Sequence, residues 1–351
     1  MTTREARVLE IIETARAKRA KFRDERITMA HGAGGKATQT LIEGLLAPAF
    51  GMEELADAAV VDEFALTTDS FVVKPLRFPG GSIGELAVNG TVNDLAMAGA
   101  RPVALSLSLI LEEGLDAEVL RAEVSAIAAA AEAAGVAIVA GDTKVVERGH
   151  ADGMYLATTG VGAPDPRAAL SPQGLRPGDR VLLSGSIGEH GTAIMLARGE
   201  FELEAEVESD TRSLWPVADA LLDAAGEDLR CMRDATRGGV ASVLNELARA
   251  SGVAMIVSER DVPVEPAVAG AAEILGIDPM YVANEGKLVA FVAPERADAA
   301  LAAMRAVPGC ERAADIGEVR TEPPGMVLVE TSFGGRRVMD QLVGDPLPRI
   351  C

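Results

Sequence analysis

The spacing of hydrophobic positions predicts an alternating helix and strand order in the first half of the chain. Apolar residues at helical spacing indicate helices over residues 37–46, 83–97 and 116–134, and Gly135 is placed to end the last of these as a C-cap. Short apolar or alternating runs predict strands over residues 66–68, 71–73, 103–111, 136–140 and 154–161. We expect the strand over 136–140 to be buried and to end at Gly141 and Asp142.

A cluster of prolines that begins near residue 163 predicts a boundary between two domains. Residues 163–179 hold Pro164, Pro166, Pro172 and Pro177, and prolines gathered in this way mark loops. Beyond them the pattern resumes, with strands expected over 181–184, 254–257, 288–292 and 326–328 and helices over 191–197, 214–225 and 238–250. We therefore predict an α/β (α+β) protein with an N-terminal domain over 29–163 and a C-terminal domain over 164–343.

The two ends of the chain differ from this pattern. Residues 1–28 predict a charged helical extension with a partial apolar face at Val8, Leu9, Ile11 and Ile12, which suits either a docking element or a solvated extension. Residues 344–351 contain two prolines and no periodicity, so we predict a flexible tail. At about 3.3 Å per residue this tail could reach about 25 Å, which would allow an inward and an outward position.

Composition narrows the class of protein. The chain has 351 residues, with 33 Lys and Arg against 53 Asp and Glu, and this charge of −20 argues against nucleic acid or an anionic membrane as a partner. Its most apolar stretch, residues 126–140, is interrupted by Glu132 and is shorter than the roughly 18 residues that a membrane span needs. The start of the chain lacks a signal-peptide core, and Cys231, Cys310 and Cys351 form no metal-type pair. We predict a cytoplasmic protein with free thiols.

Two glycine-rich loops are candidates for holding phosphate. One runs over residues 31–36 (His31, Gly32, Gly34, Gly35 and Lys36), and the other holds Arg237, Gly238 and Gly239. Backbone N–H groups at a helix start favour an anion, and a lysine could reach it. The spacing fits neither a Walker A loop nor the dinucleotide fingerprint, and an ordinary turn into a helix would explain each loop equally well.

Five aspartates at strand ends or in loops are candidates for binding magnesium. They are Asp62, Asp69, Asp94, Asp142 and Asp234. Mg²⁺ is usually held by a few carboxylates together with phosphate oxygens and water. Caps and turns would explain any single aspartate, whereas the set beside a glycine loop indicates a nucleotide and metal site.

The last residue, Cys351, is a candidate nucleophile. A free thiol has a pKa of about 8.5, and the neighbouring terminal carboxylate does not lower it, so activation would have to come from a receiving site. The cysteine is not four residues from the end, which excludes a prenylation box. An incidental terminal cysteine remains the simpler explanation when this residue is considered alone.

Taken in order, these segments resemble the HypE family of hydrogenase maturation factors. The resemblance rests on HGAGGK, TTDSFVVKPLRFPGGSIGELAVNGTVNDLAMAGARP, LILEEG, AGDTKVVERG, SGSIGEHG, RDATRGGV, ANEGKLV and the terminal PRIC, and it runs over residues 31–351. The family shares a superfamily with aminoimidazole ribonucleotide synthetase, selenophosphate synthetase and thiamine-monophosphate kinase. Residues 1–28 lie outside the resemblance.

The resemblance implies an N-terminal domain that forms a β-barrel across a homodimer, a C-terminal domain packed against it, and ATP with Mg²⁺ in the cleft. It implies a carbamoyl dehydratase in which the carbamoyltransferase HypF loads Cys351. ATP-dependent dehydration would then leave a thiocyanate, and the cyanide would pass to iron on the HypC–HypD complex, for [NiFe] hydrogenase.

The resemblance also implies roles for individual residues. Asp69, Asp94, Asp142 and Asp234, followed by Asp62, would bind magnesium. The nucleotide would be held by His31, Gly32, Gly34, Gly35, Lys36, Asn93, Thr143, Arg237, Gly238 and Gly239. Lys144 and Glu285 are both candidates for the base that removes the amide protons, and a lysine needs a lowered pKa for that task.

Two other functions are compatible with parts of the pattern. A small-molecule kinase or synthetase with the same ATP site would not need Cys351, and a scaffold for metal-centre assembly would not turn over ATP. A dehydrogenase is excluded because the chain has no GxGxxG fingerprint.

Overall fold

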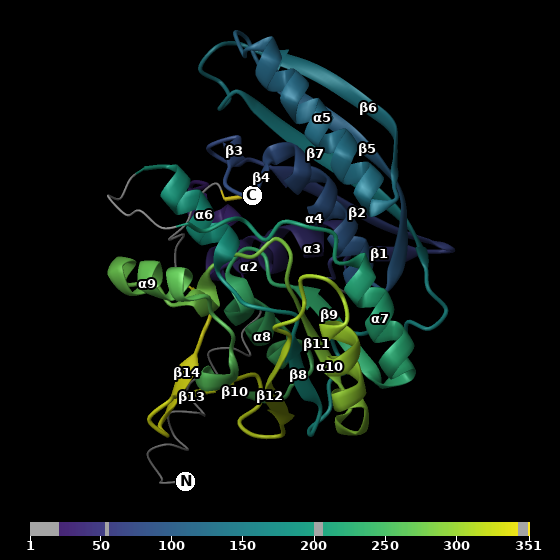
Figure 1. Cartoon of the computed structure of the whole chain (residues 1–351), viewed down its shortest axis with the longest axis vertical. Helices are drawn as coiled ribbons and strands as arrows, with labels where there is room; N and C mark the ends of the chain where they lie inside the picture. Colours follow the sequence, from purple (N-terminus) through teal and green to yellow (C-terminus); the bar gives the residue numbers. More distant parts are fainter. Residues whose placement is uncertain (1–20, 53–55, 200–205, 343–349) are drawn as a thin grey trace.

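Two β-sheets with helices packed against them make up the computed structural model of the chain (Figure 1). The structure describes residues 21–52, 56–199, 206–342 and 350–351. Most of the predicted N-terminal extension and of the tail thus lies outside the described residues. The two halves are mixed α/β, as the sequence predicts.

The first sheet has the strand order β1-β2-β7-β5-β6. Its strands are β1 (Ala59–Val61), β2 (Phe64–Phe71), β5 (Ala100–Glu112), β6 (Ala137–Val146) and β7 (Met154–Pro164). Only β5 and β6 are parallel, and the 18-residue helix α5 (Ala117–Ala134) makes the crossover between them. Asp116 caps α5 by accepting from the Glu118 N–H, and Gly135 ends it in the left-handed conformation (φ 68°).

Strand β6 differs from the sequence prediction. We expected a buried strand over 136–140, but β6 continues through Gly141 and Asp142 to Val146, and nearly all its residues are exposed. The reason is its place in the sheet, since β6 pairs with β5 alone and forms the edge. Val139 and Val145 are 68% and 67% exposed, which is unusual for valines in a strand and leaves an apolar edge in the single chain.

The second sheet has the order β14-β13-β10-β12-β8-β11-β9. Its strands are β8 (Arg180–Leu183), β9 (Leu229–Asp234), β10 (Ala254–Ser258), β11 (Leu288–Val292), β12 (Ala314–Arg320), β13 (Val327–Glu330) and β14 (Arg336–Met339). Along β8, Val181 and Leu183 pack in the cluster that holds the apolar side of α8 (Gly239–Ala250), whereas Leu182 packs with α7 (Trp215–Ala225) and α10 (Ala297–Arg305). Because strand side chains alternate, helices cover both faces of this sheet.

Helix α4 (Ile83–Met97) joins the two halves. Thirteen of its 15 residues are buried, and it packs against β2, β5 and β7 of the first sheet and against α7 and β9 of the second half. A helix that is apolar on nearly every side is stable only inside a protein. Its few polar side chains, Asp94 among them, are therefore held at the junction between the halves.

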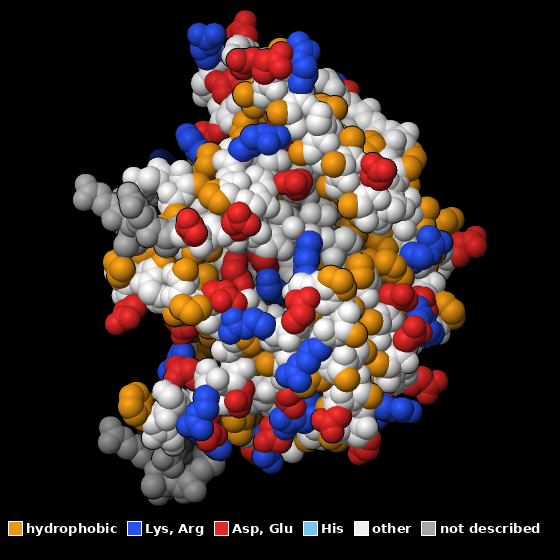
Figure 2. Space-filling view, in the orientation of Figure 1, with side chains coloured by type: hydrophobic (Ala, Val, Ile, Leu, Met, Phe, Trp, Pro, Cys, Tyr) orange, Lys and Arg blue, Asp and Glu red, His pale blue; other side chains and the backbone are white. Residues whose placement is uncertain are grey.

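The remaining elements are short or peripheral. They are α2 (Lys36–Leu41), a π-helical turn (Ile42–Leu46), α3 (Ala47–Phe50), the β3 (Arg77–Phe78) and β4 (Gly81–Ser82) ribbon, α6 (Glu189–Ala197), α9 (Pro266–Leu275) and 3₁₀ turns at Met29–Gly32, Gly226–Asp228, Glu259–Asp261, Pro279–Tyr281 and Pro294–Arg296. The predicted helix over 37–46 is thus interrupted by a π turn and extends to residue 50. Within the described residues, the helices are all too short or too polar to cross a bilayer. Figure 2 shows acidic and basic side chains interspersed over one face, without a broad basic area.

Candidate active site

Three aspartates meet where the two halves join. Oxygens of Asp57, Asp94 and Asp234 all lie within 4.8 Å of one another. Asp57 precedes β1, Asp94 lies on α4 and Asp234 ends β9, so the cluster depends on the packing of three separate elements. The Thr67 hydroxyl oxygen lies 2.7 Å from an Asp94 carboxylate oxygen and 2.9 Å from the Asp57 carbonyl oxygen, which ties the cluster to β2.

Burial makes these carboxylates hard to ionise. It raises the pKa of Asp94 well above its usual value, with added repulsion from Asp234 and Asp57. It also raises the pKa of Asp234 to about 8, with Asp57 adding to the shift and Arg233 opposing it. The pKa of Asp57 is raised by burial, although the Arg233 guanidinium lies 3.1 Å from its carboxylate. A bound divalent cation would relieve both burial and repulsion, and carboxylate oxygens are the donors that magnesium prefers.

The structure brings together two of the five predicted aspartates, Asp94 and Asp234, and adds Asp57. A third, Asp69, lies on β2 against α4, where a Cβ at Gly90 would be 3.6 Å from its carboxylate. Burial raises the pKa of Asp69, and Arg237 opposes that shift. Asp62 is exposed in the turn between β1 and β2 with a φ of 53°, at the end of the hairpin remote from Asp69.

Asp142, Thr143 and Lys144 lie apart from this cluster within one chain. They are exposed on β6, where the Lys144 ammonium lies 2.7 Å from Asp142 and the Thr143 N–H donates to Asp142. Across the sheet, Asp69 on β2 is the register partner of Thr158 on β7, and Thr158 is the partner of Leu107 on β5. Leu107 is in turn the partner of Gly141 on β6. Three strand spacings of about 4.8 Å therefore separate Asp69 from this part of β6, or about 14 Å.

The two predicted glycine loops pack against each other. The Arg237 guanidinium donates to the Gly32 carbonyl oxygen (2.9 Å), and the Ser242 hydroxyl donates to the Gly34 carbonyl oxygen (3.2 Å). A Cβ at Gly34 would come within 2.7 Å of the Arg237 carbonyl oxygen, and the φ of Gly34 is 74°. A residue with a Cβ would clash at position 34 and would be strained at this φ, so only glycine fits there. Gly238 (φ 79°) is the N-cap of α8, and Gly35 is the N-cap of α2. Segments separated by about 200 residues thus form one surface with two helix N-termini.

Three predicted nucleotide contacts are engaged with protein in this structure. The Lys36 ammonium lies 2.7 Å from Asp340, and the buried His31 ring contacts Asp24 at 2.9 Å. The buried Asn93 side chain accepts from the Leu214 N–H (2.7 Å) and donates to the Arg212 carbonyl oxygen (3.0 Å). Asn93 therefore supports the loop before α7, a structural role that the sequence prediction did not include.

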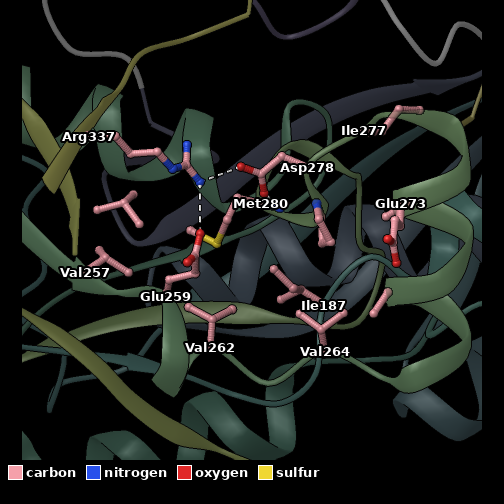
Figure 3. A pocket seen from close by; sticks show the side chains of 14 residues that line it. Ile187, Val257, Glu259, Val262, Val264, Glu273, Ile277, Asp278, Met280 and Arg337 are labelled. Carbon is pink, nitrogen blue, oxygen red and sulfur yellow. Dashed lines mark hydrogen bonds and ion pairs between the residues drawn. The ribbon is translucent and has the colours of Figure 1, made fainter. Parts of the chain in front are cut away.

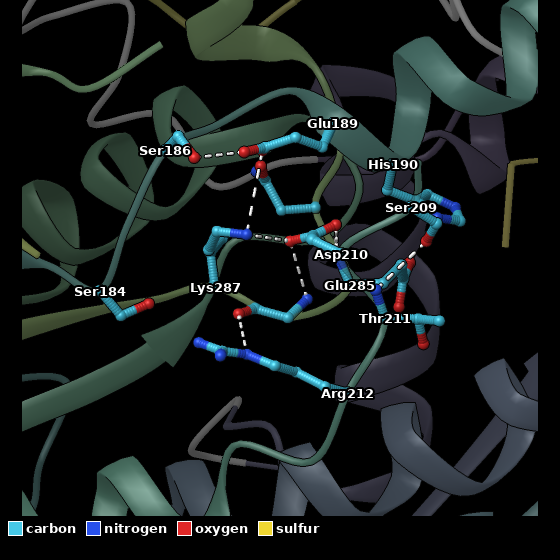
Figure 4. Close-up of polar contacts among 12 residues, drawn as sticks. Ser184, Ser186, Glu189, His190, Ser209, Asp210, Thr211, Arg212, Glu285 and Lys287 are labelled. Carbon is cyan, nitrogen blue, oxygen red and sulfur yellow. Dashed lines mark hydrogen bonds and ion pairs between the residues drawn. The ribbon is translucent and has the colours of Figure 1, made fainter. Parts of the chain in front are cut away.

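Glu285 is held by a neighbouring carboxylate, Asp210 (Figure 4). The N–H groups of Glu285 and Gly286 donate to Asp210 at 3.0 and 3.1 Å, and the buried Lys287 ammonium lies 3.0 Å from it. Burial raises the pKa of Glu285 well above its usual value, with repulsion from Asp234, Asp210 and Asp69 adding to the shift. Glu285 therefore holds its proton more tightly than an exposed carboxyl group does.

The end of the chain lies at the same site. Ile350 is buried, and the Val72 N–H donates to a terminal carboxylate oxygen of Cys351 at 3.1 Å. The Cys351 side chain lies close enough to Arg237, Glu285 and Asp69 for these groups to affect the pKa of its thiol. Burial raises the pKa of the Cys351 thiol far above its ordinary range, so the docked thiol is neutral. Figure 1 shows the C-terminus beside α6 and the β3–β4 ribbon.

A separate pocket of about 340 Å³ lies between α9 and the second sheet (Figure 3). Its lining is mainly aliphatic, with Val262, Val264 and Met280 inside, and Arg337 at its edge lies 2.7 Å from Asp278. It contains none of the predicted site residues.

Comparisons with known proteins match both halves of the chain. The family described as AIR synthase related protein matches residues 55–163 with its N-terminal domain and residues 176–329 with its C-terminal domain. The carbamoyl dehydratase HypE of Bradyrhizobium diazoefficiens is 50% identical over 341 residues, covering 95% of this chain and 99% of the relative.

Solved structures agree with these matches. A HypE–HypF complex contains a chain with a TM-score of 0.83 and 44% identity, covering 86% of this chain and 99% of that one. A hydrogenase maturation protein HypE in complex with ATP has a TM-score of 0.79 and 44% identity, covering 93% of this chain and 100% of that one.

Proposed function

Because the chain belongs to the HypE family of the AIR synthase related proteins, we propose that it uses ATP to dehydrate a carbamoyl group on its own Cys351. The product would be a thiocyanate that supplies cyanide ligands during [NiFe] hydrogenase maturation. The similar HypE bound to ATP supports the nucleotide as a reactant.

The observation that carries the proposal is the position of Cys351. The last residue of the chain lies near Glu285 and Asp69, and Asp69 is in turn close enough to Asp57 and Asp94 to raise their pKa values. A small-molecule kinase has no need for its own C-terminus at this place. An enzyme that modifies its own tail needs it there.

The three clustered aspartates would hold magnesium, with Asp69 at the edge, and the paired glycine loops would hold the phosphates of ATP. Magnesium in this place would neutralise charge on the phosphates. Arg237, which already contacts the loop through Gly32, adds positive charge beside Cys351. Phosphoryl transfer depends mainly on positioning and charge neutralisation, which such a set of groups provides.

All atoms of the proposed dehydration can be accounted for. The carbamoyl oxygen takes the γ-phosphoryl group of ATP, which releases ADP. The C–O bond then breaks, so this oxygen leaves as inorganic phosphate while nitrogen loses both hydrogens and S–C≡N remains. In its ionised form Glu285 would accept one of these protons, because it lies close enough to Cys351 to affect the pKa of the thiol.

Lys144 and Asp142 can join this site only from another chain or after a large movement, because they lie on the exposed edge of the first sheet. We propose that a homodimer, with the two first sheets closing into a barrel, covers the apolar edge of β6. In that arrangement Lys144 would remain a second candidate for the base.

The carbamoyl group should be transferred to the Cys351 thiol while the tail is outside the active site. A thiolate is the reactive form of cysteine, and the docked Cys351 is held neutral by burial. We propose HypF as the carbamoyl donor, which a similar HypE–HypF complex supports, and HypC–HypD as the acceptor of cyanide.

The test is to incubate the protein with the carbamoyltransferase, carbamoyl phosphate, ATP and magnesium, and to weigh its C-terminal peptide. A carbamoyl adduct on Cys351 that loses one water in the wild type but persists in Asp94→Ala would support the dehydratase. Cyanide delivery by Cys351→Ala would refute it. ATP turnover with an unmodified Cys351 would favour a small-molecule kinase, and no turnover would favour a scaffold.

A further inference from the structure

The buried residue His190 makes a contact with the tail that the proposed chemistry does not use. We propose that His190 is a positioning residue, which holds the last peptide unit of the chain so that the Cys351 sulfur faces Glu285. This inference rests on the proposed function, because it assigns the reactive geometry of the tail to one side chain outside the nucleotide and metal site.

The hydrogen bonds of His190 define which ring nitrogen carries the proton. Its Nε2 lies 2.6 Å from the Ile350 carbonyl oxygen, and its Nδ1 lies 2.8 Å from the Ser209 hydroxyl. A carbonyl oxygen can only accept, so Nε2 donates, and the unprotonated Nδ1 accepts from Ser209. Burial lowers the pKa of His190, with Asp210 and the Ile350 carbonyl opposing the shift, which keeps the ring neutral.

Surrounding residues fix the orientation of the ring. His190 lies in the first turn of α6 and is fully buried, and the Phe78 ring packs edge-on against it at 5.5 Å between ring centres. Ser209 is itself held, because its N–H donates to the Pro79 carbonyl oxygen at 2.8 Å. The ring therefore presents its Nε2 hydrogen to the tail without rearrangement.

One short loop connects this contact to the proposed base. Ser209 orients His190, and the next residue, Asp210, holds the backbone of Glu285 (Figure 4). The distance between the tail contact and the base is therefore set by two adjacent residues. Misplacement of a reacting group by about 1 Å can reduce a rate by about 100-fold, so this coupling matters for catalysis.

His190 acts with two other contacts on the tail. The Ile350 side chain packs in the cluster that includes Phe78 and Ile194, and the Val72 N–H donates to a terminal carboxylate oxygen of Cys351. For the two described tail residues, His190 and Val72 both make contacts with the backbone. Loss of the His190 hydrogen bond should leave Ile350 able to enter but should loosen the peptide unit before Cys351.

Two substitutions separate positioning from folding. His190→Asn places its side-chain amide near the position of Nδ1, so it can keep the Ser209 contact but cannot reach Ile350. His190→Gln extends to the position of Nε2, so it can donate to the Ile350 carbonyl oxygen. A residue with a purely structural role would not distinguish these two variants in tail behaviour.

The readouts are the alkylation rate of Cys351 by N-ethylmaleimide in the full-length protein, the single-turnover conversion of carbamoylated Cys351, and the ATP affinity. Cys231 and Cys310 are buried, and burial raises the pKa of Cys231 to about 12, so both serve as internal references in the same mass spectrum. A buried hydrogen bond contributes enough for an expected change of about tenfold.

We expect His190→Asn to be alkylated about tenfold faster at Cys351 and to convert the carbamoyl group at least tenfold more slowly, with unchanged ATP affinity. His190→Gln should return both rates toward wild type. Wild-type behaviour of His190→Asn, or equal defects in both variants, would overturn the proposal. If the wild type showed no dehydration at all, the proposed function would fail, while the alkylation rates would still decide whether His190 holds the tail.

Discussion

Replacement of Asp234 by Asn should stabilise the metal-free protein at neutral pH and remove its response to magnesium. Asp234 is 8% exposed, and burial together with Asp57 raises its pKa from 3.8 to about 8. A carboxyl group with a raised folded-state pKa binds its proton more tightly in the folded protein. The stabilisation that the protonated Asp234 gives to the folded state is therefore fully present below pH 3.8. It is lost as the pH rises from there to about 8.

The magnitude follows from the shift. From pH 3.8 to pH 7 is 3.2 units, and each unit corresponds to about 1.36 kcal/mol, which gives an upper limit of about 4 kcal/mol at pH 7. Because Asp57 and Asp94 share the same burial, removing one charge also relieves the other two. We expect Asp234→Asn to gain about 2–4 kcal/mol in the free energy of unfolding when metal is absent.

The assay is urea unfolding at pH 5, 6, 7 and 8 in EDTA and in excess magnesium. The wild type should lose stability across this range in EDTA and recover it with magnesium, whereas Asp234→Asn should lose less stability over the same range and be insensitive to metal. Asp261→Asn, which changes an exposed carboxyl group, is the matched control and should follow the wild type. A wild type that is equally stable at pH 5 and pH 8 in EDTA, or an Asp234→Asn that is less stable, would refute the reasoning.

Three further predictions concern the proposed base and its support. Glu285→Gln should bind ATP and accept the carbamoyl group but accumulate it, so mass spectrometry should find the adduct undiminished; loss of the adduct at the wild-type rate would exclude Glu285 as the base. Gly286→Ala should lower the free energy of unfolding by more than about 2 kcal/mol, because its Cβ would lie 1.9 Å from the Asp210 carbonyl oxygen. Gly270→Ala, where a Cβ meets nothing within 4 Å, is the control that should be neutral or stabilising, and similar urea midpoints for the two would contradict this. Finally, if Lys144 acts in the site of a second chain, Lys144→Ala and Glu285→Gln should each be inactive alone and should regain part of the wild-type conversion after mixing and subunit exchange; no recovery in verified mixed dimers would argue against that arrangement.

Much of the central scaffold could be predicted because its signals are local. The helices over 83–97 and 116–134 are long continuous segments, and both are present with nearly the predicted bounds. Asp94 and Asp234 stand at the ends of recognisable elements. The two glycine loops were predicted separately, and the close approach of Gly34 to Arg237 explains why the first loop needs glycine at that position.

The residues that the sequence did not reveal depend on long-range packing. Asp57 stands between two alanines with no motif of its own, and contacts made by the packed chain, with Thr67 and with Arg233, link it to the cluster. Asp210 and His190 look like ordinary loop and helix residues until Glu285 and the tail are placed beside them. The exposure of β6 was equally hidden, since an apolar sequence does not tell an edge strand from a central one.

The docked Cys351 also has a consequence for the rate law of the proposed enzyme. A substrate carried on the chain's own end is present at its site at an effective concentration fixed by the tether, of millimolar order for a short linker. The dehydration step would then be first order, independent of protein concentration, and would have no Michaelis constant for the group being dehydrated. Dilution would slow only the encounters with the donor and the acceptor, so the flux of cyanide would be controlled by how often each chain is reloaded.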